Sequence, residues 1–267
     1  MSQFPDRPAK HRVRAAFDRA ARTYDGAATL QRQAVAGLLT RLATAAPDLT
    51  GPLLDAGSGT GYALPLLAAR YPSQSLIAAD LAPAMVEASR TALATRSIPG
   101  QALCADLEAL PLADASLGLY WSSLALQWCH LPTALAEARR LLRPGGVLAI
   151  ATLGPGTFAE LAQAFATVDR HRHVLAFDDG AAIAAAIAAA GFAEPHLESE
   201  TLTVHYPDLP SLLAAIKAVG ANQVGPGRRT APLGKAGLTR LTEAYEAQRT
   251  PQGLPLSYRV VYALAQA

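Results

Sequence analysis

Three closely spaced glycines follow an acid where the chain turns from a short apolar run into a helical pattern. The run contains Asp55, Gly57, Ser58, Gly59 and Gly61. Glycines at alternate positions allow a tight turn and let a ligand lie against the backbone. The spacing differs from the G-x-G-x-x-G loop of dinucleotide sites, which disfavours a nicotinamide dehydrogenase. An acid before the first glycine is badly placed for a polyphosphate and suits an ammonium or sulfonium group, although a glycine loop alone is equally compatible with a plain turn.

Two further acids are placed to bind a nucleoside. Asp80 ends the run 76–80, where a carboxylate can accept both hydroxyls of a ribose. Asp106 ends the run 101–106 and could accept a hydrogen bond from an adenine amino group. Either acid alone reads most simply as a helix cap or a solvated loop residue. Together with Asp55, at the carboxyl ends of successive strands, they indicate a ligand-binding sheet edge.

The elements that must position these residues alternate between strands and helices. Apolar runs predict strands at 52–57, 75–80, 101–106, 117–122, 146–153, 197–206 and 258–265. Helical spacing predicts helices at 10–24, 30–42, 62–70, 83–95, 132–142, 158–170, 181–190, 209–219 and 237–248. This alternation favours an α/β fold with a doubly wound, mostly parallel sheet. Residues 1–9 show no periodicity and are expected to form an irregular tail.

Composition excludes several classes of protein. Half of the 267 residues are hydrophobic and 16% are charged, which supports a large core. A net charge of +2 is too mild to indicate a nucleic-acid partner. The most apolar late stretch, 181–192, falls short of the about 20 residues that a membrane span needs. Cys104 and Cys129 match neither a disulfide framework nor a metal motif, so we expect a cytoplasmic protein without a metal site.

Residues 50–154 resemble the class I S-adenosylmethionine-dependent methyltransferases. The resemblance rests on the glycine loop, on Asp80, on the run 105–112 around Asp106 and on Leu-Arg-Pro-Gly-Gly at 142–146. Motifs outside that region are similar to the malonyl-acyl-carrier-protein O-methyltransferases of biotin synthesis. They are Tyr-Asp at 24–25, Leu-Gln-Arg at 30–32, the run 121–129, 152–161, 206–207, 213–222, Gly-Arg at 227–228 and 254–258.

The resemblance implies an architecture and a cofactor. It implies a seven-stranded sheet with an antiparallel last strand and a helical lid inserted before it. The expected units are an N-terminal helical cap (1–49), a cofactor-binding core (50–206), a lid (207–255) and the last core strand (256–267). It also implies that S-adenosyl-L-methionine binds, leaving S-adenosyl-L-homocysteine as product. The residues expected to hold it are Tyr24, Gln31, Asp55, Gly57, Ser58, Gly59, Gly61, Asp80, Leu81, Met85, Asp106, Leu107 and Ser122.

The implied reaction methylates the free carboxyl of a malonyl group on acyl carrier protein or coenzyme A. A carboxylic acid with a pKa of about 4 is ionised at neutral pH, so no general base is needed. Gln127 and Trp128 are expected to line the methyl-transfer pocket, and Arg228 to hold the substrate carboxylate. One departure weakens this picture: where the family often has His-Val-Asn-Arg-Phe, this chain has Leu175 and Ala176 in place of the Asn-Arg pair.

The basic residues suggest a hypothesis about the partner. An acidic carrier protein would be steered by a positive rim, to which the cluster 10–22 and Arg139 or Arg140 would contribute. Three alternatives stay open. They are a methyltransferase of another small carboxylic acid, a factor acting on a protein partner as related respiratory-complex assembly factors are regarded to do, and a non-catalytic cofactor-binding module.

Overall fold

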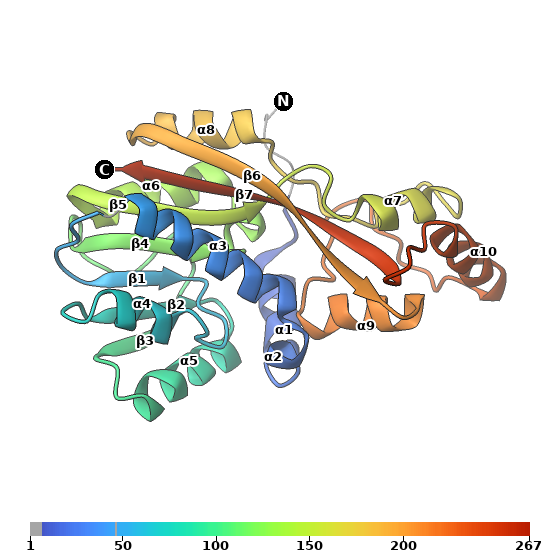
Figure 1. Ribbon diagram of the computed structural model, residues 1–267, viewed down its shortest axis with the longest axis horizontal. Coiled ribbons are helices and arrows are strands. Elements are labelled where there is room, and N and C mark those ends of the chain that lie inside the picture. The colour runs from blue at the N-terminus through green and yellow to red at the C-terminus, as the bar shows by residue number, and fades with distance from the viewer. Residues whose placement is uncertain (1–6, 46) are drawn as a thin grey trace.

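A seven-stranded sheet forms the centre of the protein, which a computed structural model describes for residues 7–45 and 47–267 (Figure 1). The strand order is β3-β2-β1-β4-β5-β7-β6. The strands are β1 (Leu53–Ala56), β2 (Leu76–Asp80), β3 (Gly100–Cys104), β4 (Leu117–Ser123), β5 (Leu142–Leu153), β6 (Ala193–Tyr206) and β7 (Leu254–Gln266). Neighbours from β3 to β5 pair in parallel, whereas β7 pairs antiparallel with both β5 and β6. The expected doubly wound α/β sheet with one antiparallel strand is therefore confirmed.

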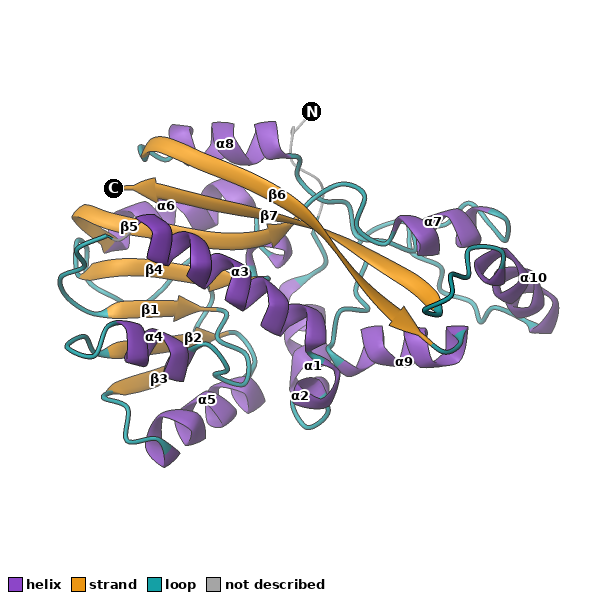
Figure 2. Cartoon of the chain, viewed as in Figure 1, coloured by secondary structure: helices purple, strands orange, loops and turns teal. Residues whose placement is uncertain are grey.

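Helices cover both faces of this sheet, and a hydrophobic core lies on each side (Figure 2). One core contains residues of α3 (Thr29–Ala45) and α4 (Leu64–Arg70), and the other contains residues of α6 (Leu131–Leu141) and α8 (Gly180–Ala189). A further helix, α5 (Pro83–Thr95), packs against β2 and β3. Because the parallel strands are covered on both sides, β1, β2 and β4 are almost continuously apolar.

The two strands β6 and β7 run beyond the rest of the sheet and carry a helical extension (Figure 1). The extension consists of α7 (Ala159–Ala166), α9 (Leu209–Ala218) and α10 (Lys235–Glu246). Helices α9 and α10 lie between β6 and β7 in the sequence, as the resemblance implied for the lid. The structure starts β7 at Leu254, four residues earlier than the alternation of 258–265 predicted.

The N-terminal segment forms two helices where one was predicted. Helix α1 (Lys10–Ala20) is followed by a turn, after which α2 (Tyr24–Ala27) begins. The Thr23 hydroxyl explains the break, because it donates to the carbonyls of Ala20 (3.1 Å) and Ala218 (3.0 Å) and so competes with the helix for backbone partners. Residues 1–6 of the expected tail lie outside the described residues.

Two boundaries that matter for the site also differ from the sequence-based prediction. Strand β3 ends at Cys104, so Asp106 lies in the turn beyond it rather than at the strand end. Helix α7 ends at Ala166 instead of residue 170, where the Thr167 hydroxyl donates to the Ala164 carbonyl (2.8 Å). The residues released by this early end form a loop, 167–179, that leads to α8.

Candidate functional site

The glycine loop and two of the predicted acids meet at the carboxyl edge of the sheet. Gly57 and Gly59 have positive φ angles of 80° and 53°. A Cβ on Gly57 would lie 2.2 Å from the Ala125 side chain, so the loop needs glycine there. Asp80 fixes the loop, since its carboxylate accepts from the backbone amides of Gly59 (3.0 Å) and Ala82 (2.9 Å).

Three adjoining hollows open around this loop, and Tyr24 lines all of them. We call them the strand-edge cavity, the polar cavity and the apolar cavity. The strand-edge cavity contains Gly57, Gly59, Asp80, Leu81, Asp106, Leu107 and Trp128, among others. The polar cavity includes Tyr24, Asp25, Gln31, Arg32, Asp55, Ser58, Thr60 and Ser123. Of the predicted cofactor residues, these two cavities gather all except Gly61, Met85 and Ser122.

The polar cavity presents hydrogen-bonding atoms that the described residues leave unsatisfied. Gln31 Oε1, Asp55 Oδ2 and Ser123 Oγ are all buried without a partner within the described ranges 7–45 and 47–267. Two of these atoms are pure acceptors, so the cavity is suited to a ligand that donates hydrogen bonds. Arg32 lies on the same cavity, which therefore offers both charge signs that a free amino-acid end requires.

Burial changes the ionisation of the acids at this edge. Burial, together with the charge of Asp80, raises the pKa of Asp55 to about 7. Burial also raises the pKa of Asp80, although the amides of Ala82 and Gly59 oppose that change. Two neighbouring carboxylates with raised pKa values favour the binding of a cation beside them.

The strand-edge cavity is closed by α1 (Lys10–Ala20). Lys10 forms ion pairs with Asp106 and with Glu108, the latter at 2.9 Å. The Phe17 ring meets Trp128 edge-on, with centroids 5.7 Å apart. Asp18 accepts from the backbone amide of Ala84 at 3.0 Å. Helix α1 is thus attached at three points along the edge where the predicted nucleoside would lie.

Helix α2 closes the neighbouring polar cavity and places Tyr24 at the junction. The Thr60 hydroxyl of the glycine loop donates to Asp25 at 2.6 Å. Burial, with the nearby charges of Asp80, Asp25 and Asp55, raises the pKa of Tyr24, so the phenol stays protonated. A Cβ on Gly59 would stand 3.9 Å from the Tyr24 ring, which shows how closely α2 approaches the loop.

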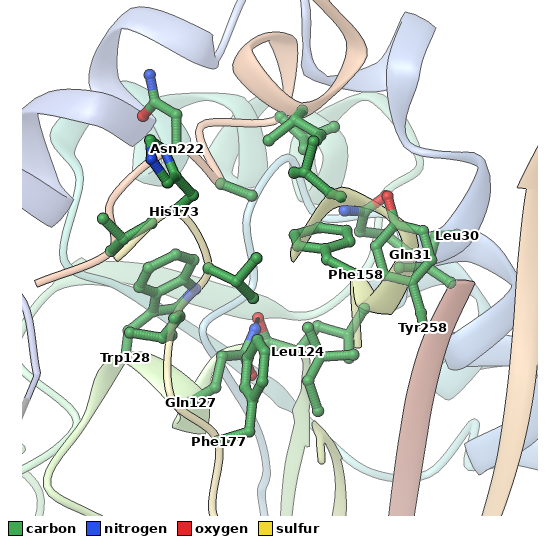
Figure 3. A pocket seen from close by; sticks show the side chains of 18 of the residues that line it. Leu30, Gln31, Leu124, Gln127, Trp128, Phe158, His173, Phe177, Asn222 and Tyr258 are labelled. Atoms are coloured by element: carbon green, nitrogen blue, oxygen red, sulfur yellow. Dashed lines mark hydrogen bonds between the residues drawn. The ribbon is translucent and has the colours of Figure 1, made fainter. Parts of the chain in front are cut away.

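The apolar cavity lies on the other side of Tyr24, between the sheet edge and the helical extension (Figure 3). Figure 3 shows Trp128 and His173 on one wall and Phe158, Gln31 and Tyr258 on the opposite wall. The predicted pocket residues Gln127 and Trp128 both line it, and so does Leu175 from the departing motif. Of the residues described along this lining, none is Lys, Arg, Asp or Glu.

The Gln127 amide is already engaged within the protein. It donates to the Leu124 carbonyl at 2.7 Å and accepts from Thr152 at 3.4 Å. The short 3₁₀ helix η1 (Leu126–Trp128), which follows β4, is thereby fixed at the cavity wall. Gln127 shapes the cavity, and these two bonds fix the orientation of its amide.

Four predicted residues lie outside the three cavities: Gly61, Ser122, Met85 and Arg228. Ser122 points into the core and donates to the Ala56 carbonyl at 2.7 Å; because side chains alternate along β4, the next residue, Ser123, faces the cavities instead. Met85 is fully buried and lines none of the three cavities. Arg228 is exposed in a separate outer depression with Arg7, His11 and Arg12, among others, rather than in the apolar cavity.

Comparisons with known proteins agree with this geometry. A family model described as "Methyltransferase domain" matches residues 54–150. The chain is 49% identical over 261 residues to the malonyl-[acyl-carrier protein] O-methyltransferase of Dechloromonas aromatica, covering 97% of this chain and 95% of that protein. The protein of the same name from Laribacter hongkongensis is 45% identical, with 96% and 89% covered. The chain belongs to the malonyl-[acyl-carrier protein] O-methyltransferase family.

Solved structures show the same fold at low sequence identity. A SAM-dependent methyltransferase of Thermotoga maritima superposes with a TM-score of 0.55 at 19% identity, covering 95% of this chain and 99% of that one. A geranyl diphosphate C-methyltransferase of Streptomyces coelicolor, solved with S-adenosyl-L-homocysteine, gives a TM-score of 0.52 at 17% identity, covering 87% and 77%. These proteins share the sheet and its surrounding helices.

The residues of this methyltransferase fit S-adenosylmethionine. The unsatisfied oxygens of Gln31 and Asp55 suit the ammonium group, and Arg32 suits the carboxylate of its methionine part. Asp80 lines the strand-edge cavity, where ribose hydroxyls would need an acceptor. Within the described part of the chain, no group of three or more His, Cys, Asp or Glu side chains could hold a metal ion. No helix among the described residues is long and apolar enough to cross a membrane.

Sequence reasoning missed several residues of this methyltransferase site. Ser122 was predicted in place of Ser123, because β4 is covered on both faces and its sequence does not show which side chains face the site. Lys10 was noted only as part of a basic cluster, yet it pairs with Asp106. Phe17 carries no motif of its own, and His173 was noted only as the first residue of the departing run 173–177; the two come from distant segments that meet only in the folded protein.

Proposed function

We propose that this methyltransferase transfers the methyl group of S-adenosylmethionine to the free carboxylate of a malonyl thioester on acyl carrier protein, giving the methyl ester that enters biotin synthesis. The observation that carries the proposal is the apolar cavity, which adjoins the polar cavity at Tyr24 and Gln31. Family membership names the substrate, and the cavity has the chemistry that the reaction requires.

The reaction requires the carboxylate to be aligned with the methyl donor and water to be excluded, and it needs no general base. The malonyl carboxyl group is ionised at neutral pH and is itself the nucleophile. Aligning it with the methyl donor can supply about 7–11 kcal/mol in well-oriented cases. An apolar wall built from rings such as Phe158, Phe177 and Trp128 removes water from the carboxylate and increases its reactivity. When bound, S-adenosylmethionine supplies an electrophilic methyl group on a sulfonium centre.

The proposed cofactor contacts follow from the cavities. Asp55 and Gln31 would bind the ammonium group, Asp80 the ribose, and Leu81 and Leu107 would pack on the adenine. Both carboxylate oxygens of Asp106 already have partners within the protein. One pairs with Lys10, and the other accepts from the Glu108 amide at 3.0 Å. We therefore assign Asp106 to holding α1 closed.

The carrier protein is proposed to approach the outer depression beside the cavity. Asn222 and Val224 line the apolar cavity, whereas the adjacent Gln223 and Gly225 line the depression, so one segment separates the two. In the part of the chain that the structure describes, Arg12 and Arg228 form no ion pair. These free cations support docking of an acidic partner.

The expected contribution of Arg139 and Arg140 to that docking is not supported. Both lie in the last turn of α6, which leads directly into the start of β5 and hence to the opposite edge of the sheet. Arg140 is also paired with Glu137 at 2.7 Å and with Asp114. Its charge is balanced locally.

The decisive test compares acyl groups on the same carrier. Purified protein, S-adenosylmethionine with a labelled methyl group, and malonyl-, succinyl- and acetyl-carrier proteins are incubated separately. We expect a methyl ester from malonyl-carrier protein and no label on acetyl-carrier protein, which has no free carboxylate. Faster methylation of free small dicarboxylic or tricarboxylic acids would replace the proposal by the alternative of a small-acid methyltransferase. Growth of a biotin-requiring strain that lacks this activity, rescued by this chain, is the matching test in cells.

A further inference from the structure

The apolar cavity needs a group that recognises an anion, and its lining offers few candidates. The polar side chains there are those of Tyr24, Gln31, Gln127, Trp128, His173, Asn222 and Tyr258. Gln127 is bonded to Leu124 and Thr152, and Gln31 also lines the polar cavity, where its unsatisfied oxygen suits the cofactor. Among the lining residues that the structure describes, His173 is the one whose side chain can carry a positive charge near neutral pH.

The His173 ring is held firmly in place. It stacks on Phe165 with centroids 3.6 Å apart and planes 5° from parallel. Its Nε2 lies 2.8 Å from Asp169 Oδ1. With one ring nitrogen bound to a carboxylate and the ring stacked, the orientation of the other nitrogen, Nδ1, is fixed too. No hydrogen bond is made by Nδ1 to any residue within 7–45 or 47–267.

Asp169 is itself braced as an anion. Its other oxygen, Oδ2, accepts from Arg229 at 2.7 Å, and the backbone amide of His171 donates to Oδ1 at 2.8 Å. Desolvation opposes ionisation, but the hydrogen bonds from His173, His171 and Arg229 hold the pKa of Asp169 well below its usual value. Asp169 therefore acts as the acceptor that fixes the His173 ring, while Arg229 neutralises the charge of the carboxylate.

We propose that His173, oriented by Asp169, is the subsite that binds the free carboxylate of the acyl substrate. The inference rests on the proposed function and deepens it. When an acyl carboxylate enters, two anions (Asp169 and the substrate) face two cations (Arg229 and His173), so the charges of this half-buried group balance. An imidazolium N–H holds one carboxylate oxygen and leaves the other free to meet the methyl group.

Arg228, the residue that sequence reasoning favoured, is poorly placed for this role. It is exposed in the outer depression, and its backbone pairs with Arg172 rather than with the cavity wall. His173, in contrast, lines the apolar cavity, and the early end of α7 explains how. By releasing 167–179 from the helix, it lets His173 reach the cavity beside Val174 and Leu175.

The test measures recognition of the charge separately from methyl transfer. The probes are the malonyl thioester of N-acetylcysteamine and its methyl ester, which differ only in the carboxylate. Their affinities are compared in the presence of S-adenosylhomocysteine. One charge-assisted hydrogen bond predicts that the wild-type protein prefers the acid by about 10- to 100-fold. His173→Gln, with His173→Asn as a second variant, is expected to reduce this preference to within about threefold and to raise KM at least tenfold, with a smaller change in kcat.

Matched variants separate recognition from damage to the fold. His171→Gln changes an exposed histidine two residues away that lines none of the three cavities, so both the preference and KM should persist. Asp169→Asn removes only the brace, and we expect an intermediate rise in KM with kcat nearly kept. Unchanged affinity for S-adenosylhomocysteine reports an intact fold in every variant.

The outcomes also separate this inference from the proposed function. A His173→Gln protein that binds the cofactor product normally and still prefers the acid overturns the subsite, and so does a wild-type protein without that preference. Loss of the preference in Arg228→Gln instead of His173→Gln would return the role to Arg228. A wild-type protein that shows the His173-dependent preference but methylates no malonyl thioester refutes the proposed reaction and leaves the subsite standing.

Discussion

The proposed cofactor side and the proposed acyl side of this site are built in different ways. On the cofactor side, Asp55, the glycine loop and Asp80 sit directly at the ends of β1 and β2, and the backbone of the sheet positions them. On the acyl side, the cavity wall is assembled from η1, the loop 167–179, the extension and the N-terminal helices. The first half is rigid and charged, whereas the second is mostly apolar and depends on contacts between distant segments. Substitutions on the cofactor side should therefore abolish cofactor binding, whereas substitutions on the acyl side should change substrate binding by smaller factors.

The largest effect is expected from removing the charge of Asp55. In Asp55→Asn, the unsatisfied carboxylate that faces the polar cavity becomes an uncharged amide, and the cofactor ammonium loses its counter-charge. We expect the affinity for S-adenosylmethionine, measured by calorimetry, to fall by at least about 100-fold, as for loss of a buried charge-assisted contact. Asp48→Asn, at an exposed carboxylate, is the control and should bind normally. Unchanged affinity in Asp55→Asn would remove Asp55 from the site.

The same substitution should stabilise the protein in the absence of ligand. Because the folded-state pKa of Asp55 is raised to about 7, its burial reduces stability increasingly as the pH rises from about 4 to about 7, and the loss is constant above that range. A shift of about three pH units corresponds to about 4 kcal/mol. In thermal unfolding, the stability of Asp55→Asn relative to the wild type should therefore increase as the pH rises through that window. Parallel curves for the two proteins would contradict the raised pKa.

The next effect concerns the backbone of the glycine loop. Gly57→Ala forces a Cβ into a positive-φ position 2.2 Å from the Ala125 side chain. We expect a loss of about 1–3 kcal/mol in unfolding free energy, measured with urea, and cofactor binding weakened at least tenfold as the loop shifts. Gly26→Ala in α2 is the contrast, since a Cβ there meets nothing within 4 Å. It should leave stability unchanged or raise it by up to about 1 kcal/mol, because alanine favours a helix.

The difference between the two sides also explains which features could be predicted from the sequence. The strands, the glycine loop and Asp80 were predictable because hydrophobic periodicity and a short local motif encode them. Ser122 was chosen instead of Ser123 because alternation along a buried strand is hidden when both faces are covered. His173 and Phe17 were not predictable as partners in one cavity, since their neighbours in space lie far away in the sequence. Arg228 follows shortly after Asn222 and Val224, which line the apolar cavity, but Arg228 itself lines the outer depression.

Cofactor binding should also depend on pH. In the free protein Asp55 has a pKa of about 7, and a bound ammonium favours its ionised form. The affinity for S-adenosylmethionine should therefore fall by up to about tenfold per pH unit below 7, where Asp55 is protonated, and fall again above about pH 8, where the amino group of the free cofactor loses its proton. Calorimetry in two buffers of different ionisation enthalpy should detect proton release near pH 6.5. In Asp55→Asn both the fall below pH 7 and the proton release should disappear; a flat wild-type profile would contradict this account.

The smallest effect is expected at the outer depression, where we propose that the carrier protein docks. Reversing the charge in Arg12→Glu or Arg228→Glu should raise KM for malonyl-carrier protein several-fold at low salt, with the difference shrinking as salt screens it. The malonyl thioester of N-acetylcysteamine, which carries no acidic protein, should be methylated at the wild-type rate. Arg96→Glu makes the same charge change at the exposed end of α5, beside the start of β3 and thus at the opposite sheet edge, and should leave both substrates unaffected. If all three variants respond alike, overall charge rather than a docking surface controls the encounter; if the short thioester suffers as much as the carrier, the depression belongs to the acyl cavity itself.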